Sequence, residues 1–133
     1  MTTQTIPEMP ASWEGSMPEW ITYATLVDIG KIPDEDFTYQ SPLMGGRLDK
    51  GGSVIDFMFK NPPDLAINVQ GNYYHYGMGV ETATRDIIGR VQLASQGIIL
   101  IFIDEDQLED NPVYYVQEAL RYRDHSRLGR RGM

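Results

Sequence analysis

The pattern of apolar and polar positions along the chain predicts three helices and four strands. Apolar residues recur at helical spacing over residues 17–29, 82–96 and 112–122. Runs rich in β-branched and aromatic residues, which are typical of strands, cover 37–40, 54–59, 65–70 and 98–103. In chain order the elements are α, β, β, β, α, β, α. Because a helix joins the last two strands, we expect them to be parallel, in a mixed central sheet with helices on both faces, an α/β (α+β) fold.

Local signals mark the ends of the helices. Ser16 and Glu19 have the spacing of a capping box at the start of the first helix, and Gly30 ends it. Asn111 followed by Pro112 is typical of the start of a helix. Each helix carries an apolar stripe that we expect to face the sheet: Trp20, Ile21, Ala24 and Val27; Ile87, Ile88, Val91 and Ala94; and Val113, Val116, Ala119 and Leu120.

The 133 residues predict one domain with two extensions. Residues 1–15 lack a sustained period and form an irregular arm, in which Trp13 is expected to anchor on the body. Residues 16–122 form the domain, and residues 123–133 form a basic tail.

Composition excludes several classes of protein. The chain has no cysteine, so disulfides and thiolate metal ligands are excluded. No apolar run has the roughly 20 residues of a membrane span, and the first residues do not resemble a signal peptide. We expect no membrane partner and a cytoplasmic or virion-associated protein that is not secreted by a signal peptide.

Charge is distributed unevenly. The net charge of −8 argues against non-specific attraction to nucleic acid. Five of the eleven cations nevertheless follow residue 120: Arg121, Arg123, Arg127, Arg130 and Arg131. Two interpretations remain open for these arginines, a solvated terminus and an arm that contacts phosphates.

Three polar side chains interrupt the two apolar strands at the centre of the chain. Asp56 lies in the first, and Asn68 and Gln70 lie at alternate positions of the second. Since residues i and i+2 share a face, these side chains are expected to meet on one rim of paired strands. Carboxylate, amide and carbonyl oxygens suit Mg²⁺. The alternative is that Asp56 caps a neighbouring backbone group or pairs with an arginine.

These residues also have a family likeness. The glycine-rich turn and Ile55-Asp56-Phe57 are followed by residues 65–71 (LAINVQG), Tyr73-Tyr74-His75, Arg85-Asp86 and residues 97–103 (GIILIFI). This run resembles the PD-(D/E)XK nuclease superfamily, and within it the very-short-patch-repair endonucleases and their small relatives. The resemblance covers residues 16–120 and implies a restriction-endonuclease-like fold.

The resemblance implies a site. Asp56 falls where the family holds its metal-binding aspartate, and Glu19 where many members have a glutamate that contacts a metal-bound water. Asn68 stands where an acid is usual and Gln70 where a lysine is usual, so the site departs from the pattern. Glu19 is already explained as a capping-box residue, which is the alternative to this role.

Further roles follow from the same likeness. Val69 would lend its carbonyl oxygen to the metal, and His75 would act as general acid or base, although a packed aromatic-cluster histidine is an equal alternative. Tyr73, Tyr74 and Arg85 are assigned to DNA contact, together with the five C-terminal arginines.

Two functions are therefore expected. The first is a DNA endonuclease, a hydrolase of phosphodiester bonds dependent on Mg²⁺ or Mn²⁺. The alternative is a catalytically inactive nuclease-like fold that serves as a nucleic-acid-binding or assembly subunit, for example of a virus particle. In that case the N-terminal arm would hold a second copy or an assembly partner.

Overall fold

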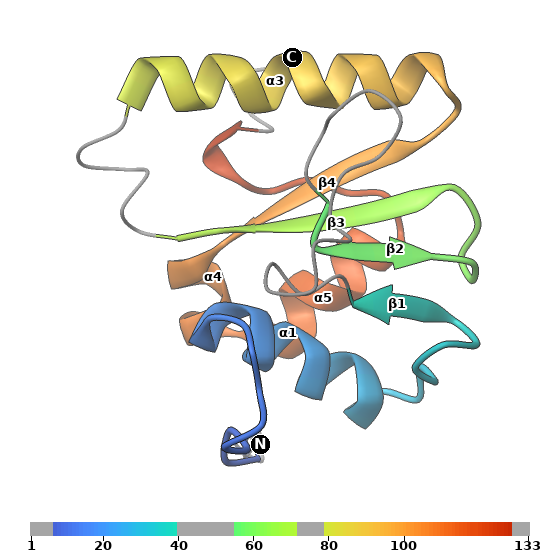
Figure 1. The fold of residues 1–133 in the computed structure, drawn as a ribbon, viewed down its shortest axis with the longest axis vertical. Helices are drawn as coiled ribbons and strands as arrows, with labels where there is room; N and C mark the ends of the chain where they lie inside the picture. The colour runs from blue at the N-terminus through green and yellow to red at the C-terminus, as the bar shows by residue number, and fades with distance from the viewer. Residues whose placement is uncertain (1–6, 40–54, 72–78, 129–133) are drawn as a thin grey trace.

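The computed structural model describes residues 7–39, 55–71 and 79–128, with the backbone alone for 79–86. The described elements, in chain order, are α1 (Met17–Asp28), β1 (Phe37–Tyr39), β2 (Phe57–Phe59), β3 (Leu65–Gln70), α3 (Gly79–Ser95), β4 (Ile99–Asp104), α4 (Glu105–Asp110) and α5 (Pro112–Leu120). The mixed α and β class is confirmed (Figure 1). The short helix α4 was not predicted.

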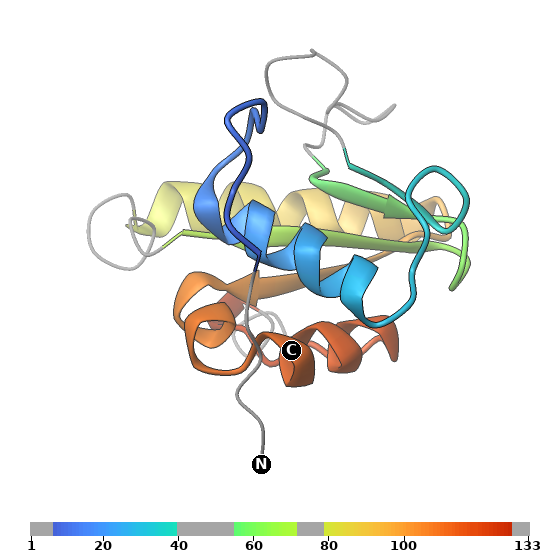
Figure 2. The same ribbon diagram turned by 90° about the horizontal axis from the view of Figure 1, so that it is seen from below.

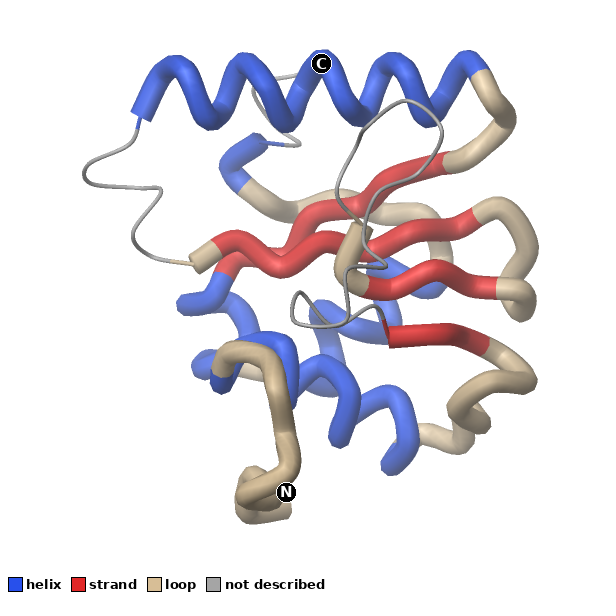
Figure 3. Tube along the Cα trace, viewed as in Figure 1, coloured by secondary structure: helices blue, strands red, loops and turns tan. Residues whose placement is uncertain are grey.

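The four strands form one mixed sheet in the order β1-β2-β3-β4 (Figure 3). β2 runs antiparallel to both of its neighbours. β3 and β4 are parallel, in register from Leu65 opposite Ile99 to Gln70 opposite Asp104. The parallel pairing that was predicted from the connecting helix is therefore confirmed.

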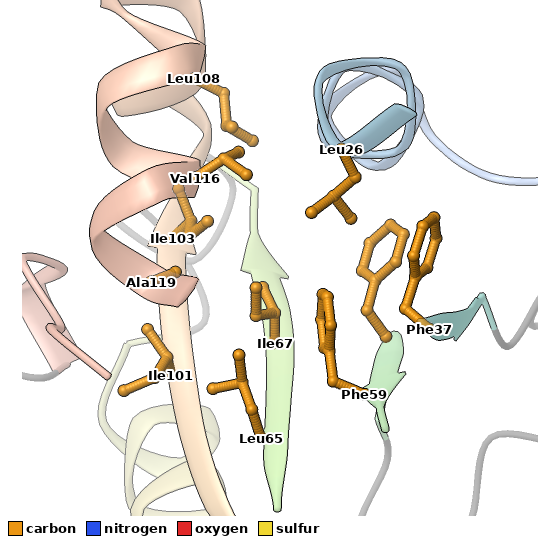
Figure 4. Packing of buried hydrophobic residues seen from close by; sticks show 11 residues of the cluster. Leu26, Phe37, Phe59, Leu65, Ile67, Ile101, Ile103, Leu108, Val116 and Ala119 are labelled. Atoms are coloured by element: carbon orange, nitrogen blue, oxygen red, sulfur yellow. The ribbon is translucent and has the colours of Figure 1, made fainter. Parts of the chain in front are cut away.

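Helices cover both faces of the sheet, as predicted (Figures 1 and 2). α1, α4 and α5 lie on one face and enclose the larger core, which consists of Leu26, Phe37, Phe57, Phe59, Leu65, Ile67, Ile101, Ile103, Leu108, Val116 and Ala119 (Figure 4). α3 lies on the other face over a smaller core, made of Ile55, Ala66, Leu93, Leu100, Phe102 and Leu128.

The ends of α1 follow their sequence signals. The Ser16 hydroxyl accepts the Glu19 N–H (3.3 Å), and the Glu19 carboxylate accepts the Ser16 N–H (2.7 Å), which completes the capping box. Gly30 follows the helix with φ 104°, a conformation that side chains with a Cβ rarely adopt. The capping role of Glu19 is therefore confirmed.

The inward faces of α1 and α3 differ from the predicted stripes. In α1, Thr22, Thr25 and Leu26 are fully buried, whereas Val27 is 45% exposed. The Thr22 hydroxyl donates to the carbonyl of Pro18 in its own helix, so a threonine can be buried here without an unpaired hydroxyl. In α3, Leu93 faces the sheet and Val91 is 62% exposed. Ile88 (52%) and Ala94 are exposed as well, so the prediction that Val27, Ile88, Val91 and Ala94 face the sheet was wrong.

The N-terminal arm is anchored by Trp13, as predicted. Its ring stacks on Tyr39 of β1 (centroids 4.6 Å apart) and contacts Trp20 and Tyr23 of α1 (5.1 and 5.2 Å). The Trp13 indole N–H donates to the carbonyl of Ser16 (3.1 Å). Residues just before the domain are therefore fixed to both α1 and the sheet.

The chain after α5 returns to the free edge of β4. The Asp124 carboxylate accepts the Phe102 N–H (2.9 Å), so a side chain takes the place of a neighbouring strand at this edge. Leu128 is buried in the smaller core. The start of the predicted tail, residues 123–128, is therefore packed on the domain. In the part of the chain that the structure describes, no helix has the length and apolar character needed to cross a membrane.

Candidate functional site

Asp56 and the end of β3 are joined by two hydrogen bonds. The Asp56 N–H donates to Asn68 Oδ1 (2.7 Å), and the Val69 N–H donates to Asp56 Oδ2 (2.9 Å). Because the Asp56 amide binds a side chain, β2 begins only at Phe57, later than predicted. Asp56 is 3% exposed. The predicted convergence of Asp56 with β3 is found, and so is the alternative in which Asp56 caps a neighbouring backbone group.

Gln70 extends this polar group along β3. Ala66 belongs to the core under α3, and alternation puts Asn68 and Gln70 on the same face. Gln70 is buried and lies opposite Asp104 in the register of β3 and β4. Polar side chains from three neighbouring segments, namely the residue before β2, the end of β3 and the end of β4, therefore gather at one edge of the sheet. This edge holds the carboxyl ends of the parallel strands β3 and β4, where open α/β sheets commonly bind ligands.

Asp104 is the residue of this group that the sequence prediction missed. It is 1% exposed, and its Oδ2 accepts the Arg127 N–H (3.0 Å) and the Arg127 guanidinium (3.2 Å). The Gln107 side chain accepts the Asp104 N–H (3.0 Å) at the start of α4. The spacing of Asp104 and Gln107 is that of a capping box, so the sequence did contain a signal for the start of α4.

The other predicted site residues are only partly described. Glu19 lies in the capping box of α1. Arg85 belongs to α3, of which the structure gives only the backbone at that point. The remaining predicted residues lie outside the described ranges: Tyr73, Tyr74, His75, Arg130 and Arg131.

The described C-terminal arginines form ion pairs within the chain. Arg121 and Arg123 lie 3.6 and 3.2 Å from the buried Glu118 carboxylate. Arg127 binds Asp104 and, at 2.8 Å, Asp106. A DNA phosphate would therefore compete with these carboxylates for the same guanidinium groups.

The chain matches no protein-family model, no curated protein and no solved structure. A function must therefore be inferred from the geometry around Asp56 and from the family resemblance of the sequence.

The donor atoms near Asp56 suit Mg²⁺ in kind but provide little charge. Asp56 contributes a carboxylate, and Asn68, Val69 and Gln70 offer amide or carbonyl oxygens, which are hard ligands. Among residues 7–39, 55–71 and 79–128, no group of three or more His, Cys, Asp or Glu side chains could hold a metal ion. We therefore expect at most weak affinity for Mg²⁺, because affinity rises with the number of charged ligands.

Glu118 gives the C-terminal segment a dependence on pH. The hydrogen bond from His125 (2.9 Å), together with Arg123, holds the pKa of the Glu118 carboxyl below its usual range. A lowered pKa stabilises the fold at pH values above the ordinary glutamate range, and this contribution is lost as the pH falls through the lowered pKa. Glu118→Gln should therefore reduce the free energy of unfolding near neutral pH, and the difference from the native chain should narrow in acid.

Urea unfolding between pH 3 and pH 7 measures this difference, because urea does not screen ion pairs as guanidinium does. Glu109→Gln is the matched control, since Glu109 is exposed on α4. A difference in unfolding free energy between the native chain and Glu118→Gln that stays the same from pH 3 to pH 7 would contradict the assignment.

Proposed function

We propose that the chain is a metal-dependent DNA endonuclease of the PD-(D/E)XK type, with its site at Asp56 and the end of β3. The observation that carries the proposal is the pair of hydrogen bonds that joins Asp56 to Asn68 and Val69. The resemblance assigns a metal-binding aspartate and its β3 partners to these positions.

The topology also supports the proposal. A helix precedes three strands, a second helix leads to the fourth strand, and the sheet order is β1-β2-β3-β4 with β3 and β4 parallel. This arrangement agrees with the restriction-endonuclease-like fold that the resemblance implies. The acid at the start of β2 and the amides at the end of β3 are then neighbours because β2 and β3 are antiparallel.

Each residue has a specific role in this proposal. Asp56, the Val69 carbonyl and Asn68 would hold Mg²⁺ or Mn²⁺, with Glu19 acting through water. The metal, when bound, polarises the phosphodiester and acidifies a coordinated water. Gln70 would orient the attacking water through its amide, and His75 would protonate the leaving oxygen. Tyr73, Tyr74, Arg85 and the C-terminal arginines contact DNA.

The experiment is a cleavage assay on supercoiled plasmid and branched DNA with Mg²⁺ or Mn²⁺, and with EDTA as control. We expect nicked or linear product only with metal. The melting temperature should also rise with millimolar metal, because a ligand of the folded state stabilises it by about 0.4 kcal/mol when its concentration equals the dissociation constant. If metal produces no cleavage and no rise in melting temperature, the proposal is overturned.

A second candidate is a catalytically inactive nuclease-like fold that binds nucleic acid or serves in an assembly. It is favoured by the uncharged Asn68 and Gln70 and by the buried Asp56 carboxylate, which already accepts a backbone N–H. In this candidate Asp56 only stabilises the fold, by accepting the Val69 N–H, and has no role in catalysis. Metal would then have no effect on stability, and Asp56 would matter only through its hydrogen bonds.

A further inference from the structure

α1 is apolar on two sides, and the sheet covers only one of them. Thr22, Thr25 and Leu26 face the core and are fully buried. On the outward side Met17, Trp20 and Val27 follow helical spacing, whereas Ala24, which has the same spacing, is 6% exposed. Met17 is 51% exposed and Val27 is 45% exposed.

The N-terminal arm lies on this outward side of α1. Figure 2 shows the arm in front of α1, with the sheet behind the helix. The Trp20 indole N–H donates to the carbonyl of Pro7 (2.8 Å), a type of bond by which aromatic surfaces receive proline-containing segments. Trp20 therefore binds a proline-containing segment, which in this structure is the arm of its own chain.

The arm is fixed at one end and exposed along the rest of its length. The Trp13 ring packs against Trp20, Tyr23 and Tyr39, so the C-terminal end of the arm is fixed to the domain. Residues 7–12 are all exposed, so their position against their own α1 buries little surface. From Trp13 to Pro7 an extended chain reaches roughly 20 Å, which is sufficient to cross to a neighbouring molecule.

We propose that the outward face of α1 is the contact between two copies of the chain, with residues 7–12 of each copy lying on Trp20 of the other. When identical chains exchange an arm, each arm makes the same contacts with the other chain that it makes with its own, so the exchange requires little free energy. Aromatic residues and methionine are enriched in such contacts and charges are depleted. In a chain of net charge −8, Met17, Trp20 and Val27 are uncharged, and Asp28 at the end of α1 is the exposed charge next to them.

The first test is the mass in solution, measured by light scattering from micromolar to millimolar concentration. We expect a dimer of the 15.1 kDa chain. Val27→Asp and Met17→Glu, both at exposed positions, should give monomers with unchanged circular dichroism. Val91→Asp, at an exposed position of α3 on the other face of the sheet, should remain dimeric. A monomeric native chain, or a Val27→Asp dimer, overturns the proposal.

The second test addresses the arm, and it uses the absence of cysteine from the chain. Chains with Glu8→Cys are mixed with chains with Met17→Cys and treated with a thiol-specific cross-linker. We expect cross-linked pairs of the two chains, and far fewer when Val91→Cys replaces Met17→Cys. A dimer without this cross-link overturns the arm exchange. Either result leaves the endonuclease proposal unaffected, because DNA cleavage is assayed separately.

Discussion

Replacement of Asp56 by asparagine is expected to preserve the fold and to abolish metal-dependent cleavage. The asparagine carbonyl oxygen can still accept the Val69 N–H, which in the native chain donates to Asp56 Oδ2 at 2.9 Å. The negative charge that holds the metal is lost. We expect a fall in cleavage rate on the order of 100-fold or more, since metal stabilisation of the transition state is worth several kcal/mol.

Replacement by leucine separates the structural role of Asp56 from the chemical one. Leucine fills the site but leaves the Val69 N–H without its acceptor. The free energy of unfolding should fall by about 1–3 kcal/mol, the cost of an unpaired buried donor. Urea unfolding measures this loss, and plasmid cleavage measures the activity of both variants.

Asp64→Asn is the matched control for both substitutions. Asp64 is exposed in the turn before β3, with φ 60°, a conformation that asparagine adopts readily. Cleavage by Asp56→Asn at the native rate would contradict the metal role. An Asp56→Leu chain as stable as the native one would contradict the capping role.

The order of the elements, apart from α4, could be predicted because each of them depends on local patterns. The apolar runs of β3 and β4 and the helix between them sufficed to predict a parallel pair. The convergence of Asp56 with β3 followed from the period of two along strands. These inferences need no knowledge of which surfaces meet in the folded chain.

The inward faces of the helices could not be predicted in the same way. α1 has apolar residues around its circumference, so periodicity alone does not decide whether Leu26 or Val27 faces the sheet. Thr22 and Thr25 lie outside the apolar stripe of the sequence yet are fully buried, and Thr22 satisfies its hydroxyl within the helix. The choice of face was made by tertiary packing against α4, α5 and the sheet.

The way in which the C-terminal segment packs on the domain also depends on tertiary contacts, which the sequence does not show. Arg127 and Asp124 reach β4 from more than twenty residues away, at Asp104 and Phe102. The sequence showed a group of arginines after residue 120, which is compatible with solvation, with phosphate binding and with internal pairing. The folded structure shows that Arg121, Arg123 and Arg127 form ion pairs with carboxylates of the domain.

Phe57→Ala is expected to cause the largest loss of stability, about 3–5 kcal/mol, which is typical of removing a buried aromatic ring. Phe57 is fully buried in the larger core, and its ring lies near Tyr39 (5.1 Å) and Phe37 (6.2 Å). β2 has three residues, and Phe57 joins both neighbouring strands, opposite Tyr39 and Ile67. Among the described strands, β2 alone lies between β1 and β3, so this contact joins the two sides of the sheet.

Equilibrium urea unfolding measures this loss, with Val91→Ala as control at an exposed position of α3, where the change should be within about 0.5 kcal/mol. The substitution should also loosen the adjacent bond between the Asp56 N–H and Asn68, since Phe57 fixes the start of β2. Amide hydrogen exchange at Asp56 and Val69 would then accelerate more than the loss of global stability requires. A loss of less than about 1 kcal/mol would mean that the core can collapse around the missing ring, and that Phe57 does not hold the site in position.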